Sequence, residues 1–431
     1  MNQYDSNRIY DIMKKINYVK TSNSSEADCY VLNTCHIREK ATEKVYHDVG
    51  RIKKNFKNKK KPIVVIAGCV AQAEGEILLQ REKYVDAVIG PQSYSKLNEI
   101  VLKLENKSDE IISTDFNVIE KFDTLNSIKN LDNNISSFLT IQEGCNKFCK
   151  FCVVPYTRGP EYSRSIAELL SECISLEQNG SKEITLIGQN VNAYNHNGTK
   201  LSSLIKEISK LKKIERIRYT TSHPNDFTTD LIEIHGENKK LMPLIHLPVQ
   251  SGSNKILRSM NRKHTIEEYL DLIGKLKKVN PSLKFSSDFI IGYPGETEND
   301  FKQTLKLLKE VEFINSYSFI FSPRPGTPAA KMKKVDKDAS KERLIIFQEA
   351  ASKLKMKFRR ELFNKNSLVL FENQTDNKDE YFGRDEFSNS VIVKTKENLV
   401  GKLRNIKILT GNQNSLKGEI NLNAENEVYA A

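Results

Sequence analysis

The chain has 431 residues, of which 38% are hydrophobic and 28% are charged, and its formal net charge is +12. This length exceeds one ordinary core, so two or three domains are expected. No apolar run approaches the roughly 18 residues of a membrane span, and no basic-then-apolar leader opens the chain. We therefore expect a cytoplasmic protein with no membrane partner.

The positive charge has two interpretations. Basic clusters at 51–61 and 353–360 would suit binding to nucleic acid. The richness in Lys, Asn and Ile would equally follow from an AT-rich genome. Composition leaves both interpretations open.

The first 100 residues alternate helix and strand patterns. Apolar residues recur on one face of a predicted helix at 4–16, and short apolar runs at 28–33, 62–68 and 84–90 predict buried strands. Such runs are typical of a parallel sheet covered on both faces. Residues 1–100 are thus predicted to form an α/β domain, and the polar interval 101–136 a linker.

From residue 137 the alternation becomes regular. Strand patterns fall at 138–144, 183–189, 216–222, 244–251, 285–292 and 316–322, with helical patterns between most of them. Six such units over 137–361 predict a parallel barrel or part of one. Ser165 and Glu168 predict a capping box, Gly180 a helix end, and Cys173 a place in the core.

The C-terminal pattern differs from the rest. Short strand patterns at 367–373, 381–387, 390–396 and 399–411 alternate with polar turns. Residues 362–425 are therefore predicted to form a small all-β barrel.

Seven cysteines without a leader argue against a disulfide framework and favour metal binding or catalysis. Cys145, Cys149 and Cys152 lie within eight positions, after the first predicted barrel strand. Three thiolates on a four-iron cluster leave one iron open to a small molecule, which a catalytic cluster needs. A zinc site with a distant fourth ligand and chance clustering remain alternatives.

Polar residues follow several barrel strands, where barrel enzymes place their chemistry. They are Gln189, Asn190, Asn192, Ser222, His223, His246, Gln250, Ser251, Asp288 and Arg324. We expect Gln189, Asn190, Ser222, Gln250 and Asp288 to contact a cofactor, although loop capping would explain any one of them equally well. His196, His235 and His264 are expected at the surface.

The three-cysteine stretch resembles the radical S-adenosylmethionine (SAM) enzymes. Together with "NTCHIREKATEKV", "AGCVAQ", "IGQNVNAY", "RIRYTTSHP", "HLPVQSGS", "DFIIGYPGET" and "SPRPGTPAA", it resembles the methylthiotransferase family. The resemblance implies a Rossmann-like N-terminal domain, a radical SAM partial barrel and a C-terminal TRAM barrel. Cys145, Cys149 and Cys152 would hold a [4Fe-4S] cluster that binds SAM, whose 5′-deoxyadenosyl radical abstracts hydrogen. Asp385 departs from the family, where a threonine usually follows the arginine.

The resemblance also implies a substrate. The phrases resemble the branch that adds a methylthio group to C2 of N6-isopentenyladenosine, 3′ of the tRNA anticodon. The branch that modifies threonylcarbamoyl-adenosine and a tRNA-binding protein with a structural cluster are the alternatives. The implied partners are tRNA and an electron donor such as flavodoxin or ferredoxin, and a monomer is expected. The clusters carry the chemistry, so no catalytic side chain is assigned.

The family carries a second, auxiliary [4Fe-4S] cluster, held by three cysteines. Cys35 and Cys69 match two of them, whereas Cys29 is expected in the core. The third would lie two positions before Met1, so it is absent from this chain. Because an α/β domain normally begins with a strand, we expect Met1 to be internal to a longer protein with about ten upstream residues, including a first strand. A variant holding its auxiliary cluster with two cysteines is the alternative.

Overall fold

The computed structural model describes residues 1–35, 39–106, 111–115, 121–122 and 134–421, without the side chains of 39–42. The chain forms two compact units. The first comprises Met1–Asp132, Thr140–Ser175 and Ser322–Lys331, and the second comprises Asn133–Leu139, Leu176–Phe321 and Met332–Ala431. Each unit is described by itself.

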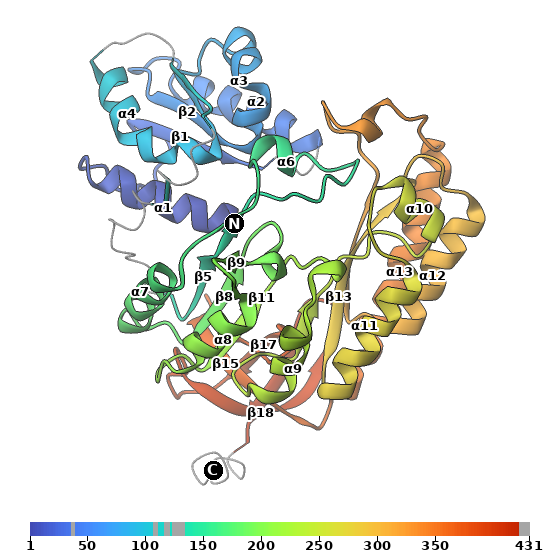
Figure 1. The fold of residues 1–431 in the computed structure, drawn as a ribbon. Helices are drawn as coiled ribbons and strands as arrows, with labels where there is room; N and C mark the ends of the chain where they lie inside the picture. Colours follow the sequence, from blue (N-terminus) through green and yellow to red (C-terminus); the bar gives the residue numbers. More distant parts are fainter. Residues whose placement is uncertain (36–38, 107–110, 116–120, 123–133, 422–431) are drawn as a thin grey trace. The chain divides into compact units, whose positions relative to one another are not determined.

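The first unit is built on a parallel sheet with helices on both faces (Figure 1). The strands are β1 (Cys29–Thr34), β2 (Ile63–Gly68), β3 (Ala87–Ile89) and β4 (Ile111–Ser113), paired in that order. Helices α1 (Asn2–Lys14) and α4 (Leu97–Glu105) pack on one face, and α2 (Glu39–Asn55) and α3 (Cys69–Arg81) on the other. The predicted first helix and the three predicted strands are confirmed.

Part of the interval 101–136, expected to be a linker, belongs to the sheet and core of the first unit. Helix α4 runs to Glu105, β4 adds a fourth strand to the sheet, and Phe122 is fully buried in the core beside α1 and α4. Strand β4 has only three residues, so it shows no sustained apolar period. Such short segments are recognised by what they pair with and not by their own pattern.

A buried ion-pair cluster fastens α1 to α7 (Ile166–Gln178) within the first unit. Glu172 accepts hydrogen bonds from Arg8 at 2.5 Å and pairs with Arg164 at 2.8 Å. Burial alone would raise the pKa of Glu172, but the charges of Arg164 and Arg8 outweigh it and lower the pKa to about 2. The predicted Ser165–Glu168 capping box opens this helix.

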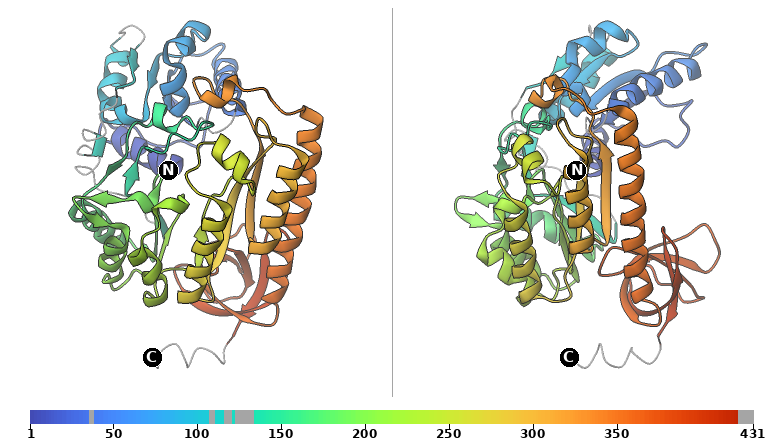
Figure 2. Two further views of the ribbon diagram at one scale, coloured as in Figure 1. Left: turned by 45° about the vertical axis from the view of Figure 1, so that its right-hand side comes forward. Right: turned by 90° about the vertical axis from the view of Figure 1, so that its right-hand side faces the viewer.

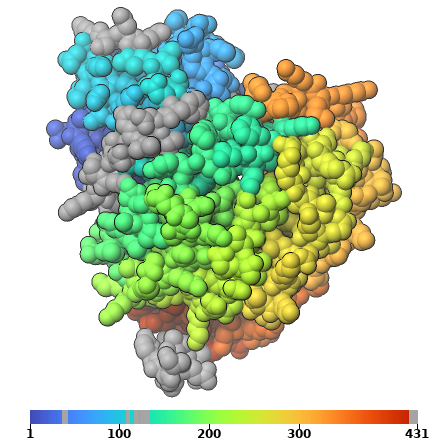
Figure 3. Space-filling view, viewed as in Figure 1, coloured from blue at the N-terminus to red at the C-terminus, as the bar shows by residue number. Residues whose placement is uncertain are grey.

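The second unit contains two three-stranded sheets. They are β11–β8–β5 and β12–β13–β14, from β5 (Ser136–Thr140), β8 (Glu183–Ile187), β11 (Arg216–Tyr219), β12 (Leu244–His246), β13 (Lys284–Ile291) and β14 (Asn315–Ile320). These strands confirm the six predicted patterns. Connecting helices include α8 (Leu201–Ser209), α9 (Thr229–Glu237), α11 (Ile266–Val279) and α12 (Glu298–Val311). In the space-filling view, the side chains of α9 and α11 meet on the green to yellow surface (Figure 3).

Strand β13 shows why the two faces of its sheet differ. Phe285, Phe289 and Ile291 pack into a core formed with α11, α12 and the long helix α13 (Lys337–Glu361), which cover the same face (Figure 2). The alternate residues Ser286 and Asp288 lie on the opposite face, because successive side chains of a strand point to opposite sides.

Residues after α13 close a five-stranded barrel. Its strands are β15 (Asn366–Gln374), β16 (Glu380–Arg384), β17 (Ser390–Lys394), β18 (Leu403–Gly411) and β19 (Leu416–Ile420). The four predicted strands are confirmed, and β19 is an addition. Asp385 is buried and accepts backbone hydrogen bonds from Phe387 and Asn389, so it organises the turn between β16 and β17.

Two arginines of β11 attach this barrel to the sheet. Arg216 donates to the carbonyls of Arg384 and Leu368, and Arg218 donates to those of Asp385 and Glu386. Arg218 also pairs with Glu183 at 2.9 Å. Across the described residues, no helix is long and apolar enough to cross a membrane.

The Glu172 cluster predicts an acid-sensitive contribution to stability. Because the folded-state pKa of Glu172 lies below the ordinary 4.5, its ionisation stabilises the folded protein by about 3 kcal/mol. This stabilisation is fully present above pH 4.5 and is lost as the pH falls through 2. Glu172→Gln should destabilise the protein by about that amount at pH 7 and flatten its stability between pH 4.5 and 2. Urea unfolding across this range measures both effects. Glu207→Gln, which removes an exposed ion pair, is the control and should change the free energy of unfolding by less than about 0.5 kcal/mol. If Glu172→Gln and the parent protein showed the same pH dependence of stability, Glu172 would not be the acid-sensitive group.

Candidate cysteine site and strand-end site

The three predicted cluster cysteines lie in one loop of the first unit. The loop leaves β6 (Gln142–Glu143), contains the short helix α6 (Val154–Thr157) and returns as β7 (Tyr162–Ser163), which pairs with β6. Gly144 opens it with φ +76°, and a Cβ there would lie 1.9 Å from the Pro160 carbonyl oxygen. The Cys145 N–H donates to the Gly159 carbonyl at 3.2 Å, which closes the base of the loop.

The thiols of this loop have the donor chemistry that a cluster requires. None forms a disulfide, Cys149 is buried, and Cys145 and Cys152 are half-buried. Backbone N–H groups of Val154 and Lys147 donate to the sulfurs of Cys152 and Cys145, as they would to thiolate ligands. Burial raises the pKa of Cys145 to about 11, so in this environment the thiol holds its proton until a metal displaces it.

The described residues do not form a ready-made metal site. No three His, Cys, Asp or Glu side chains among them are placed to hold a metal ion together. The residues therefore fit a cluster by donor type and spacing. We predict that the three thiols point into one cavity.

Cys35 and Cys69 follow neighbouring parallel strands of the first unit, as predicted. Cys35 comes directly after β1, and Cys69 is the first residue of α3, directly after β2. The last residues of these strands, Thr34 and Gly68, are register partners, so both cysteines lie at the carboxyl edge of the sheet. Gly68 has φ +96°, and a Cβ there would lie 2.3 Å from the Thr34 carbonyl oxygen.

Arg158 links the three-cysteine loop to Cys69. Its Nε lies 3.4 Å from the Cys69 sulfur, while its Nη2 donates to Asp5 at 2.8 Å and its Nη1 to Glu143 at 3.3 Å. Lys121 lies 2.5 Å from Glu143, so two buried carboxylates are balanced by two buried cations. Burial opposes ionisation of Asp5, but the charges of Lys121 and Arg158 outweigh it and hold its pKa below the ordinary value.

This network was missed by the sequence reasoning. Gln92 adds to it by donating to Glu143 and to the Arg158 carbonyl. The sequence could have pointed to Glu143 and Arg158, because these two residues lie close to the three cysteines on either side of them. Asp5, Gln92 and Lys121 carry no such signal, because distant parts of the chain bring them there.

The other cysteines outside these sets are confirmed as core residues. Cys173 is fully buried on α7. Cys29 is half-buried and packs against the core formed by α1 and β2, and burial raises its pKa to about 12.

All five expected cofactor contacts belong to the second unit: Gln189, Asn190, Ser222 and Gln250 follow strands β8, β11 and β12, and Asp288 lies within β13. Asn190, after β8, is buried and donates to Asp226 at 2.7 Å. Ser222, after β11, is buried and its hydroxyl has no hydrogen-bond partner among the described residues. Asp288 lies 3.5 Å from His246 on the neighbouring strand. Gln189 follows β8 as predicted, and whether any of these side chains contacts a cofactor remains a prediction.

Two residues at these strand ends adopt unfavourable backbone conformations. Thr221 has φ +72° and Gln250 has φ +77°, a region that β-branched and bulky residues rarely enter. The backbone of Gln250 is held on β13 by hydrogen bonds to Asp288 and Ile290. Strain of this kind persists where surrounding structure enforces it, and it concentrates at functional sites.

Other predicted strand-end residues serve the loops themselves. Asn192 exchanges hydrogen bonds with the backbone of His223, and the Ser251 hydroxyl lies 3.4 Å from that of Thr304. Arg324 belongs to the first unit and contacts Ser322 there. For Asn192 and Ser251, loop capping is the role that the contacts support.

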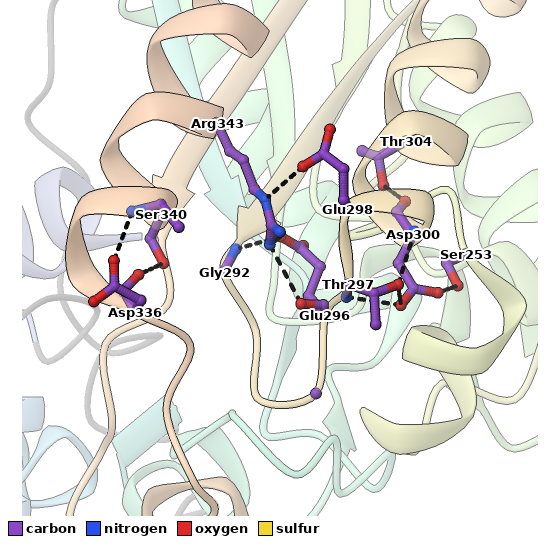
Figure 4. Close-up of polar contacts among 12 residues, drawn as sticks. Ser253, Gly292, Glu296, Thr297, Glu298, Asp300, Thr304, Asp336, Ser340 and Arg343 are labelled. Carbon is purple, nitrogen blue, oxygen red and sulfur yellow. Dashed lines mark hydrogen bonds and ion pairs between the residues drawn. The ribbon is translucent and has the colours of Figure 1, made fainter.

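Carboxylates fix the loops that follow β12 and β13 (Figure 4). Asp300 accepts a hydrogen bond from Ser253 at 2.6 Å, which ties the loop after β12 to α12. Glu296 accepts from the Gly292 N–H and from Arg343 of α13, both at 3.0 Å, which ties the loop after β13 to that helix.

The expectation that His235 and His264 are surface residues is wrong. His235 is 3% exposed and its ring bonds to the Tyr219 hydroxyl at 2.6 Å. His264 is 5% exposed beside His223 and Tyr269. Burial lowers the pKa of each to about 3, so both imidazoles are neutral. His196 is half-buried.

The Arg158 network predicts a specific loss on conservative substitution. Arg158→Lys keeps the charge but cannot donate to a sulfur and two carboxylates at once. It should lower the free energy of unfolding of the metal-free protein by about 2–4 kcal/mol, because a buried carboxylate loses its partner. Thermal and urea unfolding measure the change. Arg51→Lys, at an exposed pair, is the control; similar small effects of both substitutions would remove Arg158 from this role.

Comparisons with known proteins agree with the residues described above. The model described as the radical SAM superfamily matches residues 139–308, and that of the uncharacterized protein family UPF0004 matches residues 1–90. By structure, the chain is similar to the radical S-adenosylmethionine methyltransferase TsrM from Kitasatospora setae, with a TM-score of 0.54 and 12% identity, covering 76% of this chain and 74% of that one. At this identity the likeness concerns the fold alone.

Curated relatives match nearly the whole chain. The chain is 57% identical to the tRNA-2-methylthio-N(6)-dimethylallyladenosine synthase of Pelagibacter ubique (strain HTCC1062), covering 99% of this chain and 97% of the relative. It is 49% identical to the enzyme of that name from Wolbachia pipientis subsp. Culex pipiens (strain wPip), covering 97% of each. The chain therefore belongs to the radical SAM superfamily and, within it, to the family of tRNA-2-methylthio-N(6)-dimethylallyladenosine synthases.

Proposed function

We propose that this chain adds a methylthio group to C2 of N6-isopentenyladenosine 3′ of the tRNA anticodon. Membership of the synthase family over nearly the full length carries the proposal. The five-stranded barrel fits the TRAM domain that the sequence predicted, and such a barrel suits binding of the tRNA backbone. The partners are tRNA and an electron donor such as flavodoxin or ferredoxin, and the enzyme acts in the cytoplasm as a monomer.

Two sets of cysteines would hold the cofactors. Cys145, Cys149 and Cys152 fit a [4Fe-4S] cluster that binds SAM, and Cys35 and Cys69 would contribute to an auxiliary [4Fe-4S] cluster. When bound, the clusters supply the electron that splits SAM and the sulfur that is methylated and inserted. Both sets belong to the first unit, and Arg158 contacts Cys69 from the three-cysteine loop, which supports a shared reaction site.

The strand-end residues of the second unit would bind SAM or the substrate base. Ser222 offers a buried hydroxyl without a partner among the described residues, and burying such a group without a ligand is unfavourable. Asn190 and Gln250 follow β8 and β12, and Asp288 lies within β13 beside β12. Gln189 completes this proposed set.

Substituting the two cysteine sets should separate two activities. Cys149→Ala should abolish release of 5′-deoxyadenosine from SAM under dithionite, because a cluster with three protein ligands loses one. Cys35→Ala should keep this release and lose methylthiolation. Cys29→Ala, which removes a core cysteine at the opposite end of β1, is the matched control and should keep both activities. Equal loss of both activities in Cys35→Ala would contradict separate roles.

The product identifies the substrate. Chromatography and mass spectrometry of tRNA nucleosides from a deletion strain should show N6-isopentenyladenosine without its methylthio group, restored by the gene. Loss of methylthiolated threonylcarbamoyl-adenosine instead would assign the chain to the other tRNA branch. A tRNA-binding protein without catalysis would release no 5′-deoxyadenosine.

Basic residues of the small barrel should bind RNA phosphates. Lys394 on β17 and Lys417 on β19 are exposed on adjacent strands. Replacing both with Ala should weaken tRNA binding and reduce the slope of log K against log salt by about 1.5. Deleting residues 362–425 would be a poorer test, because Arg216 and Arg218 would lose buried partners. Lys210→Ala is the exposed control, and an unchanged salt slope in the double variant would exclude this surface.

A further inference from the structure

The three-cysteine loop exposes two aromatic side chains that the proposed function leaves without a role. Phe148 and Tyr156 are 53% and 51% exposed, and their ring centroids lie 6.3 Å apart in an edge-to-face arrangement. A scattered exposed aromatic residue is normal on a protein surface. An exposed pair in mutual contact, on the loop that carries the reactive centre, indicates a binding surface.

The backbone holds Phe148 in an unfavourable conformation. Its φ is +48°, in the left-handed region that costs a bulky residue about 1–2 kcal/mol. Hydrogen bonds on both sides fix the loop, from Cys145 to Gly159 and from Cys152 to Cys149. The conformation that exposes this ring is therefore imposed by the loop against local preference.

The chemistry of this surface matches unpaired RNA. Lys147 and Lys150 lie in the same loop as the two rings, with their side chains half-buried. Aromatic rings that stack on bases, combined with cations for phosphates, are how proteins bind single-stranded nucleic acid. An acidic protein would bind the two lysines equally well, but the exposed pair of rings favours unpaired RNA bases as the ligand.

We propose that Phe148 and Tyr156 form a platform for an unpaired base that neighbours the modified adenosine, with one ring stacked on the base, the other supporting it edge-on, and Lys147 and Lys150 beside its phosphate. This inference rests on the proposed function, in which the anticodon loop approaches the three-cysteine loop. The platform would be a second RNA-binding surface besides the TRAM barrel, and it would position the target nucleotide. An extruded base leaves its neighbours unstacked, and a protein ring can replace the lost stacking.

Leucine substitutions test the platform, because they keep an apolar side chain and remove the ring. Phe148→Leu and Tyr156→Leu should each weaken binding of an anticodon stem-loop RNA roughly 5- to 150-fold, as measured by fluorescence anisotropy. Phe138→Leu replaces a 38% exposed aromatic residue outside this loop and is the matched control. Unchanged RNA affinity in both loop variants would overturn the proposal.

Abasic RNAs identify the stacked base. Removing the base 5′ or 3′ of the target adenosine should cancel the effect of Tyr156→Leu at one of these two positions. An equal loss with intact RNA and with both abasic RNAs would overturn the platform. Slower reduction by an acidic flavoprotein with unchanged RNA affinity would assign the surface to a protein partner and would likewise overturn it.

Two controls separate this inference from other failures. Tyr156 lies outside the span of the three cysteines, so Tyr156→Leu decides the question if Phe148→Leu loses iron. If the proposed function were wrong, the result would differ: the protein without substitutions would bind the RNA but would form no methylthiolated product.

Discussion

The arrangement of the first unit depends on the guanidinium of Arg158. It donates to the sulfur of Cys69 at the start of α3, to Asp5 of α1 and to Glu143 beside the three-cysteine loop. Each of these groups would be costly to bury alone, because the interior offers no water to replace lost hydrogen bonds. Together they satisfy one another, and in doing so they hold the N-terminal sheet and the cysteine loop in one body.

The second unit uses a different device for the same purpose. Its strands end in loops that are held from outside by carboxylates, with Asp300 bound to Ser253 and Glu296 bound to Arg343. Arg216 and Arg218 fasten the small barrel through backbone carbonyls, which do not depend on the identity of the barrel's side chains. The loops nearest the strand ends are thereby rigid, which reduces the conformational entropy lost when a ligand binds.

Three departures from local preference lie in the regions that the proposed chemistry uses, although others lie elsewhere in the fold. Thr221, Gln250 and Phe148 all occupy the left-handed region without being glycine. Ser222 adds a buried hydroxyl without a partner among the described residues. A fold selected for stability alone would relieve such costs, whereas a binding site retains them because they place polar atoms and rings where a ligand needs them.

The sequence by itself determined the architecture and the metal ligands that we expect. Apolar periods located the first helix and the main strands of the three sheets and the barrel, because the burial of a regular face depends on the local sequence. The spacing of Cys145, Cys149 and Cys152 indicated a cluster with an open iron. Tertiary structure alone decided which distant residues share an environment. Lys121 lies in a polar interval that reads as a linker, yet it is buried against Glu143. His235 and His264 read as surface residues but are buried, because neighbouring helices and loops cover them and nothing in their local sequence records that cover.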